Sequence, residues 1–208
     1  PVPVSSRFSL PLADLQNLAD DAVRLARKGG ASACEADVSE GFGQSVTVRQ
    51  GEVETIEYNR DKGLGITVYL GQRKGYASTS DFSRQALAQT VDAALAIARY
   101  TAEDPCAGLP EKALLAKQWQ DPQLYYPWQL SVEGAIDLAR RCEDAAFAVS
   151  PLVKNSEGAT VSLQEGQFAT ANSLGFAGGY PSSRHYIACS VIAILTTIGI
   201  VLYIASMW

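Results

Sequence analysis

Residues 49–82 read RQGEVETIEYNRDKGLGITVYLGQRKGYASTSDF, and this stretch decides the fold of the 208-residue chain. Residues that favour strands lie on both sides of Gln50-Gly51 and again run into Gly71-Gln72. Such runs around two-residue turns predict two successive β-hairpins. Ser80 or Asp81 then offers an N-cap for a helix. The stretch therefore predicts three strands followed by a helix.

Three amphipathic helices are predicted from the spacing of apolar residues. The first spans residues 11–28 and ends at Gly29-Gly30. The second ends near Tyr100, and the third is capped by Ser131 and ends near Val149. The inward residues expected for the second and third helices are Leu87, Val91, Ala94, Leu95 and Ala98, and then Ala135, Leu138, Ala139, Cys142, Ala146 and Val149.

Short segments between turn residues predict the remaining strands. The expected fold class is α+β, with mixed or antiparallel sheets and three flanking helices, and with two related α+β units as a possible arrangement. The strands are expected at residues 34–39, 44–50, 52–58, 63–70, 73–79, 152–154, 159–164, 167–172 and 185–192.

The chain divides by composition into two units, a connector and a tail. Prolines break the region 101–130, with one or two helical turns expected around Glu111 to Gln118. In both units a helix precedes a Ser-Glu-Gly tripeptide, a strand and a turn, and the second turn is expected at Glu165-Gly166-Gln167. Either the units arose by duplication, or any helix followed by a hairpin shows this order. The parts are residues 1–100, 101–130, 131–193 and 194–208.

A second block runs from Asn155-Ser-Glu-Gly-Ala-Thr through Ala171 to His185 and follows the first stretch in a recognisable order. Together the two blocks resemble the PmbA family, the TldE half of the TldD/TldE bacterial proteolytic pair, long described as modulators of DNA gyrase. The resemblance covers roughly residues 8–193. The chain is less than half as long as a full family member.

The resemblance implies a function in cytoplasmic proteolysis of peptide substrates, such as a microcin precursor or an antitoxin. In such a pair the zinc belongs to the TldD-type partner, on an HExxxH-type helix in its C-terminal half. This chain has one histidine, His185, so no metal ligands and no catalytic residues are assigned to it. The chain is expected to be an inactive scaffold and substrate-channel partner. The alternatives are a peptide-binding module that adds a strand near residues 165–172, or a truncated gene product without independent function.

Charge and cysteine spacing exclude other classes of function. The formal net charge is −5, and the basic runs do not exceed Arg24 to Lys28 and Arg73-Lys74, so a phosphate-binding face and direct nucleic-acid binding are not expected. Residues 1–11 lack a signal-peptide core, which favours the cytoplasm. Buried thiols are expected instead of a zinc or redox motif, because the cysteines are scattered at Cys34, Cys106, Cys142 and Cys189.

One loop is a candidate for contacting a peptide. A glycine-rich aromatic loop between two strands would let a backbone approach closely, although a flexible crossover loop has the same composition. His185 follows Ser182, Ser183 and Arg184, but neighbours in a strand point to opposite sides, so a surface or loop histidine is expected rather than a Ser-His dyad. The candidate peptide-contacting residues are Gly175, Gly178, Gly179 and Tyr180.

Other short motifs are given structural interpretations. Gly41-Phe-Gly43 and Gly63-Leu-Gly65 are expected to be turn glycines, because neither opens a helix as a phosphate loop does. Residues 60–62 alternate in charge and are expected to form a solvated loop. Glu52 and Glu54 are expected to be exposed and not to act as a catalytic pair.

The tail from Tyr186 to Trp208 carries no charged residue and is long enough to pass for a membrane span. The family resemblance argues against this, because it continues Cys189 to Ala193 as a strand that leads into a polar turn. A reading-frame slip or truncated product is the favoured explanation, with a membrane anchor as the alternative. Ile194 to Trp208 is rich in β-branched residues, so we expect it to extend the strand or to pair with a neighbouring copy.

Overall fold

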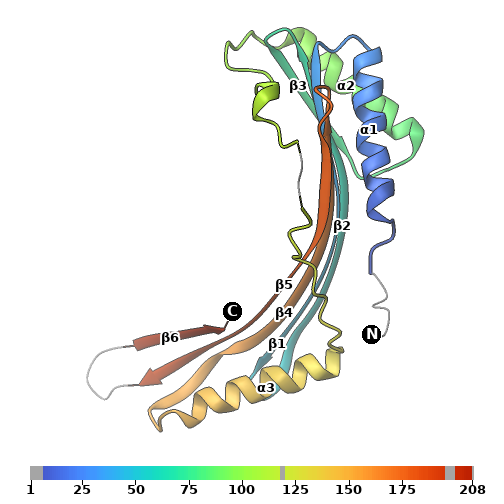
Figure 1. Cartoon of the computed structure of the whole chain (residues 1–208). Helices are drawn as coiled ribbons and strands as arrows, with labels where there is room; N and C mark the ends of the chain where they lie inside the picture. Colours follow the sequence, from blue (N-terminus) through green and yellow to red (C-terminus); the bar gives the residue numbers. More distant parts are fainter. Residues whose placement is uncertain (1–6, 118–119, 195–199, 208) are drawn as a thin grey trace.

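A six-stranded antiparallel sheet in the order β3-β2-β1-β4-β5-β6 forms the body of the molecule (Figure 1). The computed structural model describes residues 7–117, 120–194 and 200–207. Three helices flank the sheet, so the expected α+β class is confirmed. The elements are α1 Leu12–Lys28, β1 Ala33–Arg49, β2 Glu52–Leu70, β3 Arg73–Thr79, α2 Arg84–Tyr100, the 3-10 turn η1 Lys112–Leu114, α3 Val132–Ala148, β4 Val153–Asn172, β5 Ala177–Ile194 and β6 Ile200–Met207.

Both predicted hairpins are confirmed. β1 and β2 pair from Arg49 opposite Glu52 outward, and β2 and β3 pair from Leu70 opposite Arg73. Gln50 and Gly51 have φ angles of 53° and 78°, the left-handed values that a type I′ hairpin turn requires at both central positions.

The strands are longer than the sequence suggests, and several predictions are wrong for that reason. β1 and β2 each run through a predicted break: Gly41 lies opposite Asp61, and Gly43 lies opposite Asn59. The turn glycines and the charged loop at residues 60–62 are therefore strand residues. The turn expected at Glu165-Gly166-Gln167 is likewise inside β4, which pairs with β1 and β5 on either side. A long ladder, formed on both sides of β1 and β4 and on one side of this part of β2, overrides the weak strand propensity of glycine.

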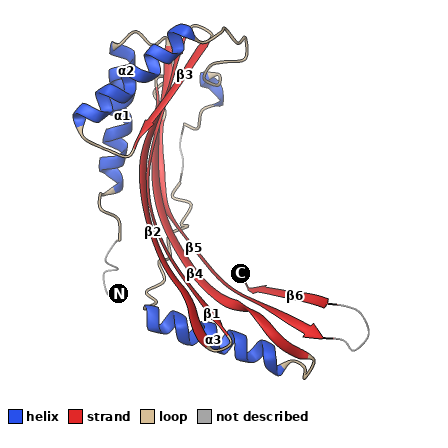
Figure 2. Cartoon of the chain, turned by 180° about the vertical axis from the view of Figure 1, so that it is seen from behind, coloured by secondary structure: helices blue, strands red, loops and turns tan. Residues whose placement is uncertain are grey.

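The sheet is bent along its strands, and all three helices lie on its convex side (Figures 1 and 2). Even-numbered residues of β1 face the helices at both ends, so α1, α2 and α3 cover one face. None of α1, α2 and α3 covers the opposite, concave face (Figures 1 and 2). Side chains crowd on the inner side of a bend, and glycines relieve this crowding. By strand register the glycines of the concave face are Gly41, Gly43, Gly63, Gly65, Gly166 and Gly178.

Each end of the sheet has its own apolar core. The inward residues expected for α2 are all buried in the first core, between α1, α2 and the sheet. Ser83 caps α2 by accepting a hydrogen bond from Ala86 N, so the caps expected at Ser80 or Asp81 are wrong. In the second core Ser131 caps α3 as predicted, and Ala135 and Ala139 are buried. Val149 is 80% exposed, so its inward assignment is wrong.

A buried carboxylate joins α3 to the β1–β2 turn. Glu143 is only 1% exposed, and its two oxygens accept hydrogen bonds from Gln50 N at 2.9 Å and Gly51 N at 2.8 Å. Arg140 Nε donates to Gly51 O at 2.8 Å. These bonds satisfy turn groups that have no partner within the hairpin, and the sequence did not indicate them. We name these residues the Glu143 clamp.

The connector runs beside β5, ahead of the segment of β5 that pairs with β6. Within it, η1 forms one helical turn inside the expected segment, of which Gln118 lies outside the described residues. Ser183 N donates to Leu124 O at 2.9 Å, and Tyr126 N donates to Ser183 Oγ at 2.8 Å. One sheet thus joins the two expected units, and their division at residues 101–130 stays a prediction.

The tail adds to the sheet. β5 continues to Ile194, and β6 pairs with its last eight residues, from Ile187 opposite Met207 to Ile194 opposite Ile200. Of the predicted tail segment, residues 195–199 and 208 lie outside the described residues. Among the described residues no helix has the length and apolarity needed to cross a membrane. Self-association through this tail stays a prediction.

We predict that Leu95→Asp unfolds the first core, because Leu95 is 3% exposed and an unpaired buried carboxylate costs roughly 4 kcal/mol. Ile97, on the exposed side of the same helix, is 47% exposed and serves as the control. Thermal melts of Leu95→Asp and Ile97→Asp should differ strongly, and equal melts would contradict this description of the core.

We also predict that Glu143→Ala lowers the free energy of unfolding by about 3 kcal/mol, because two turn N–H groups lose a charged acceptor. Asp144→Ala, at the exposed neighbouring position, is the matched control. Urea denaturation measures both variants. A loss for Glu143→Ala no larger than the loss for the control would show that the clamp does not stabilise the turn.

Candidate functional site

The concave face is built from rows of residues that lie opposite one another across four strands. In one row Glu57, Ser45, Ser162 and Tyr186 lie side by side on β2, β1, β4 and β5. The next row holds Asn59, Gly43, Gln164 and Arg184. Alternation along each strand brings these hydroxyl, amide and charged groups to the same face.

A hollow of about 620 Å³ lies along these two rows. Hydroxyls and amides dominate its lining, together with one carboxylate and two exposed tyrosines. Such groups can hydrogen-bond the backbone of an extended peptide, and Tyr186 adds an apolar surface. The hollow is lined by Gly43, Gln44, Ser45, Glu57, Tyr58, Asn59, Ser162, Gln164 and Tyr186.

The predicted peptide-contacting residues divide among three places. Tyr180 and Gly178 lie on the concave face, where the Tyr180 ring packs edge-on against Phe168 at 4.8 Å between centroids. Gly179 points to the other face, and a Cβ there would lie 2.2 Å from Phe168 O, so close strand packing explains this glycine. Gly175 lies in the β4–β5 turn with a φ of 92°. Only Gly175 belongs to a loop, because β5 begins at Ala177. Peptide contact by these residues stays a prediction.

The alternative of a peptide-binding module that adds a strand near residues 165–172 is wrong in its location. Residues 165–172 belong to β4, which has β1 on one side and β5 on the other, so they offer no free edge for strand addition.

His185 lies on the convex side of β5, opposite Leu163, and is half-buried. Its ring meets Trp128 edge-on at 5.5 Å between centroids, and Nε2 is buried without a hydrogen-bond partner. The expectation of a surface or loop histidine is therefore wrong. Ser182 and Arg184 point to the opposite face, as the alternation of a strand requires, and they form no dyad with His185.

A buried polar cluster lies on the convex face, between the two apolar cores. Glu40 Oε1 accepts from Ser9 N at 2.6 Å, while Gln167 Nε2 donates to Glu40 Oε2 at 3.2 Å and to Leu10 O at 2.7 Å. Glu165 accepts from Tyr125 OH at 2.8 Å and pairs with Arg7 at 3.3 Å. We name this the Glu40–Glu165 cluster.

Electrostatics in this cluster favour the ionised carboxylate. Burial alone would raise the pKa of Glu40, but hydrogen bonds from Ser9, Gln167 and the Leu10 backbone outweigh it and hold the pKa below its usual value. The cluster thereby fastens the segment before α1 to the middle of the sheet. Sequence inspection missed it, although glutamate and glutamine at inward strand positions, such as Glu40 and Gln167, signal buried polar groups.

The cysteines do not form a metal site. Burial raises the pKa of Cys189 to about 11, with contributions from neighbouring Cys142 and Glu143. Cys34 and Cys189 are buried as expected, whereas Cys106 is exposed, so the prediction of a buried thiol is wrong for Cys106. Among residues 7–117, 120–194 and 200–207, no three His, Cys, Asp or Glu side chains are grouped to hold a metal. The donors in this part of the chain do not fit a zinc site, which needs three or four converging ligands.

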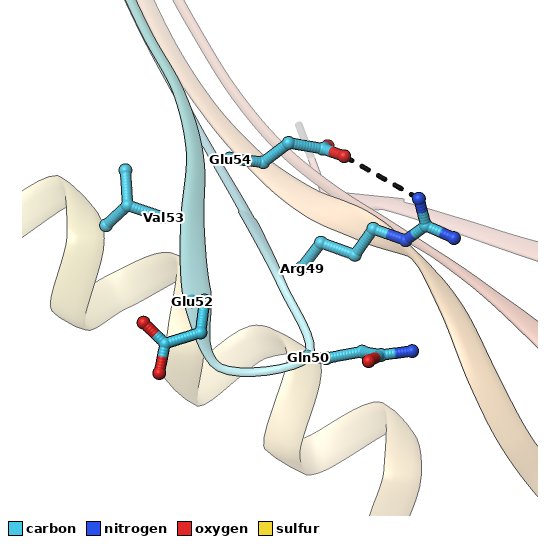
Figure 3. A pocket seen from close by; sticks show the side chains of 5 residues that line it. All are labelled: Arg49, Gln50, Glu52, Val53 and Glu54. Carbon is cyan, nitrogen blue, oxygen red and sulfur yellow. Dashed lines mark ion pairs between the residues drawn. The ribbon is translucent and has the colours of Figure 1, made fainter.

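A second, shallower hollow of about 350 Å³ lies at the β1–β2 turn (Figure 3). Arg49 and Glu54 pair across it at 3.6 Å, while Val53 and Glu52 point away from them. Glu52 and Glu54 are both exposed, as predicted. The site has no group placed for acid–base chemistry, and we assign it no role.

Comparison with known proteins identifies two matching family models. The PmbA/TldA metallopeptidase domain 1 model matches residues 34–98, and the PmbA/TldA metallopeptidase central domain model matches residues 125–200. Metalloprotease PmbA of Escherichia coli O157:H7 is 45% identical over 179 residues, which cover 86% of this chain and 40% of that protein. The Metalloprotease PmbA homolog of Haemophilus influenzae is 44% identical with the same coverage. The chain spans about 40% of the length of these curated relatives.

Solved structures share the fold. A proposed modulator of DNA gyrase from Bacteroides thetaiotaomicron superposes with a TM-score of 0.81 at 18% identity, covering 92% of this chain and 44% of that one. TldE from Thermococcus kodakarensis superposes with a TM-score of 0.66 at 12% identity, covering 90% and 42%. At these identities the likeness extends to the fold.

We predict that Glu40→Gln destabilises the protein at neutral pH and that the difference from wild type shrinks on acidification. A carboxyl whose pKa is lowered by folding contributes stability above its unfolded pKa, about 4.3, and that contribution is lost as pH falls through the folded value. Thermal melts between neutral pH and about pH 3 test this, with exposed Glu52→Gln as control. A constant difference across the range would contradict the prediction.

Proposed function

The chain belongs to the PmbA/TldD metallopeptidase family, and we propose that it forms the N-terminal part of a PmbA/TldE-type subunit that works with a zinc-carrying TldD-type partner on peptide substrates. The observation that carries this proposal is the 45% identity to Metalloprotease PmbA over 86% of the chain. The cytoplasm is the proposed location.

The proposed role of this part is to form a wall of the substrate channel and to perform no chemistry. The scattered cysteines and the single histidine, which packs against Trp128, supply no converging ligands for zinc. The concave face supports the role of a wall, because its hydroxyl and amide groups suit peptide backbone and its hollow is open along the strands. Zinc and the reacting groups would come from the partner.

A non-enzymatic peptide-binding module is the second candidate, and the same concave face supports it. The two candidates differ in the fate of a bound peptide when a TldD-type subunit is added. If the chain is a binding module, the peptide remains intact. If the chain is part of a protease, the peptide is cleaved.

We predict that the purified chain binds no stoichiometric zinc and cleaves no peptide by itself. In a full-length subunit assembled with a TldD-type partner, Ser162→Trp should reduce peptide cleavage at least tenfold by filling the hollow. Thr160→Trp is the control, because Thr160 lies on the same face of β4, one row outside the hollow. Metal analysis and a fluorescent peptide assay measure these effects. One tightly held zinc per chain, or full cleavage by the Ser162→Trp complex, would overturn the proposal.

A further inference from the structure

The outer edge of β2 is left open over most of its length. β3 pairs only with Leu64–Leu70 of β2, so no described strand pairs with the outer side of residues 52–63. Every side chain from Glu52 to Lys62 is exposed. This edge is about 40 Å long at roughly 3.3 Å per residue, and its alternate N–H and C=O groups face solvent. Proteins usually cover or shorten such an edge, because it is a template for another strand.

The opposite side of the sheet shows what kind of chain such an edge accepts. β5 occupies the place in the sheet order that matches β2, counted outward from the central pair β1 and β4. Along β5, the extended connector forms two hydrogen bonds with Ser183. Leu124 O accepts from Ser183 N, and Tyr126 N donates to Ser183 Oγ. An extended segment without secondary structure of its own therefore lies against the matching edge.

The side chains of the open edge favour a particular peptide. Ile56 and Tyr58, on the convex side, are 44% and 57% exposed, because α3 covers β1, β4 and β5 but not this part of β2. Further along the same side, Arg60 and Lys62 lie over the rings of Phe42 and Phe82 and leave their charges at the surface. An added strand would therefore meet an apolar stretch and then two cations on this side.

We propose that the β2 edge, residues 52–63, binds an extended peptide segment as an additional strand, with apolar side chains against Ile56 and Tyr58 and a carboxylate against Arg60 and Lys62. Main-chain hydrogen bonds give such a complex its affinity, and alternate side chains give it specificity. This edge adjoins the concave hollow, which Glu57, Tyr58 and Asn59 also line, but strand addition here does not require the proposed partnership with a metalloprotease. A peptide substrate of that partnership would be one natural occupant.

The test uses a fluorescein-labelled peptide of about twelve residues, with valine at alternate positions and two glutamates near one end. Fluorescence anisotropy should show saturable binding to the whole chain. The same peptide with N-methyl groups on alternate amides should lose at least tenfold in affinity, because strand pairing needs those N–H groups. Ile56→Lys should weaken binding at least tenfold, while Ile97→Lys, at a position of similar exposure on α2, should not.

Charge reversal tests the direction of the preference. The double variant Arg60→Glu, Lys62→Glu should prefer a peptide in which lysine replaces glutamate. Thermal melts of each variant establish that it is folded. Equal binding of the N-methylated peptide, or unchanged binding by Ile56→Lys, would overturn the proposal. So would a wild-type dimer that fails to bind peptide and that Ile56→Lys converts to a monomer, because a second copy would then occupy the edge. None of these outcomes bears on cleavage by a complex with the TldD-type partner.

Discussion

The continuous ladder between β1 and β4 is the constraint on which the rest of the structure depends. It runs without a shift from Glu35 opposite Asn172 to Val48 opposite Ala159, and it carries the sheet from one apolar core to the other. A slip of one residue would turn every side chain of a strand to the other face. Because each strand supplies inward residues to both cores, a slip would empty both at once. The register is therefore specified twice, once by α1 and α2 and once by α3.

Buried carboxylates join segments that the two apolar cores do not hold together. Glu40 and Glu165 lie between the cores, and Glu143 lies under the β1–β2 turn. Each carboxylate forms hydrogen bonds or an ion pair with at least two groups from segments distant in sequence. These interactions offset the cost of burying its charge. Removal of one partner would leave a buried charge, which makes these contacts specific anchors for the chain before α1, the end of the connector and the hairpin tip.

The sequence predicted what local signals determine. Helical periodicity located three helices to within a few residues, and the hairpin turn at Gln50-Gly51 followed from turn chemistry. It failed where a long-range ladder overrides a local signal: the glycines of β1 and β2 and the charged residues 60–62 were assigned to turns and loops. The inward position of Glu143 could not be predicted either, because its partners are turn amides that lie 92 and 93 residues away. The candidate residues Gly178 and Tyr180 were placed on a loop, yet β4 pairing holds them in a strand.

The concave face arises only from joining the two halves of the sheet. The strand order is the same when read outward from its centre, with β1, β2 and β3 on one side and β4, β5 and β6 on the other, and a 17-residue helix precedes each half. Ser45 from the first half lies directly opposite Ser162 from the second, at the middle of the hollow. Either half alone would expose that seam as an open strand edge and would supply only half of the lining. The two units suggested by the sequence thus describe how the chain is assembled, whereas the surface offered to a peptide belongs to their junction.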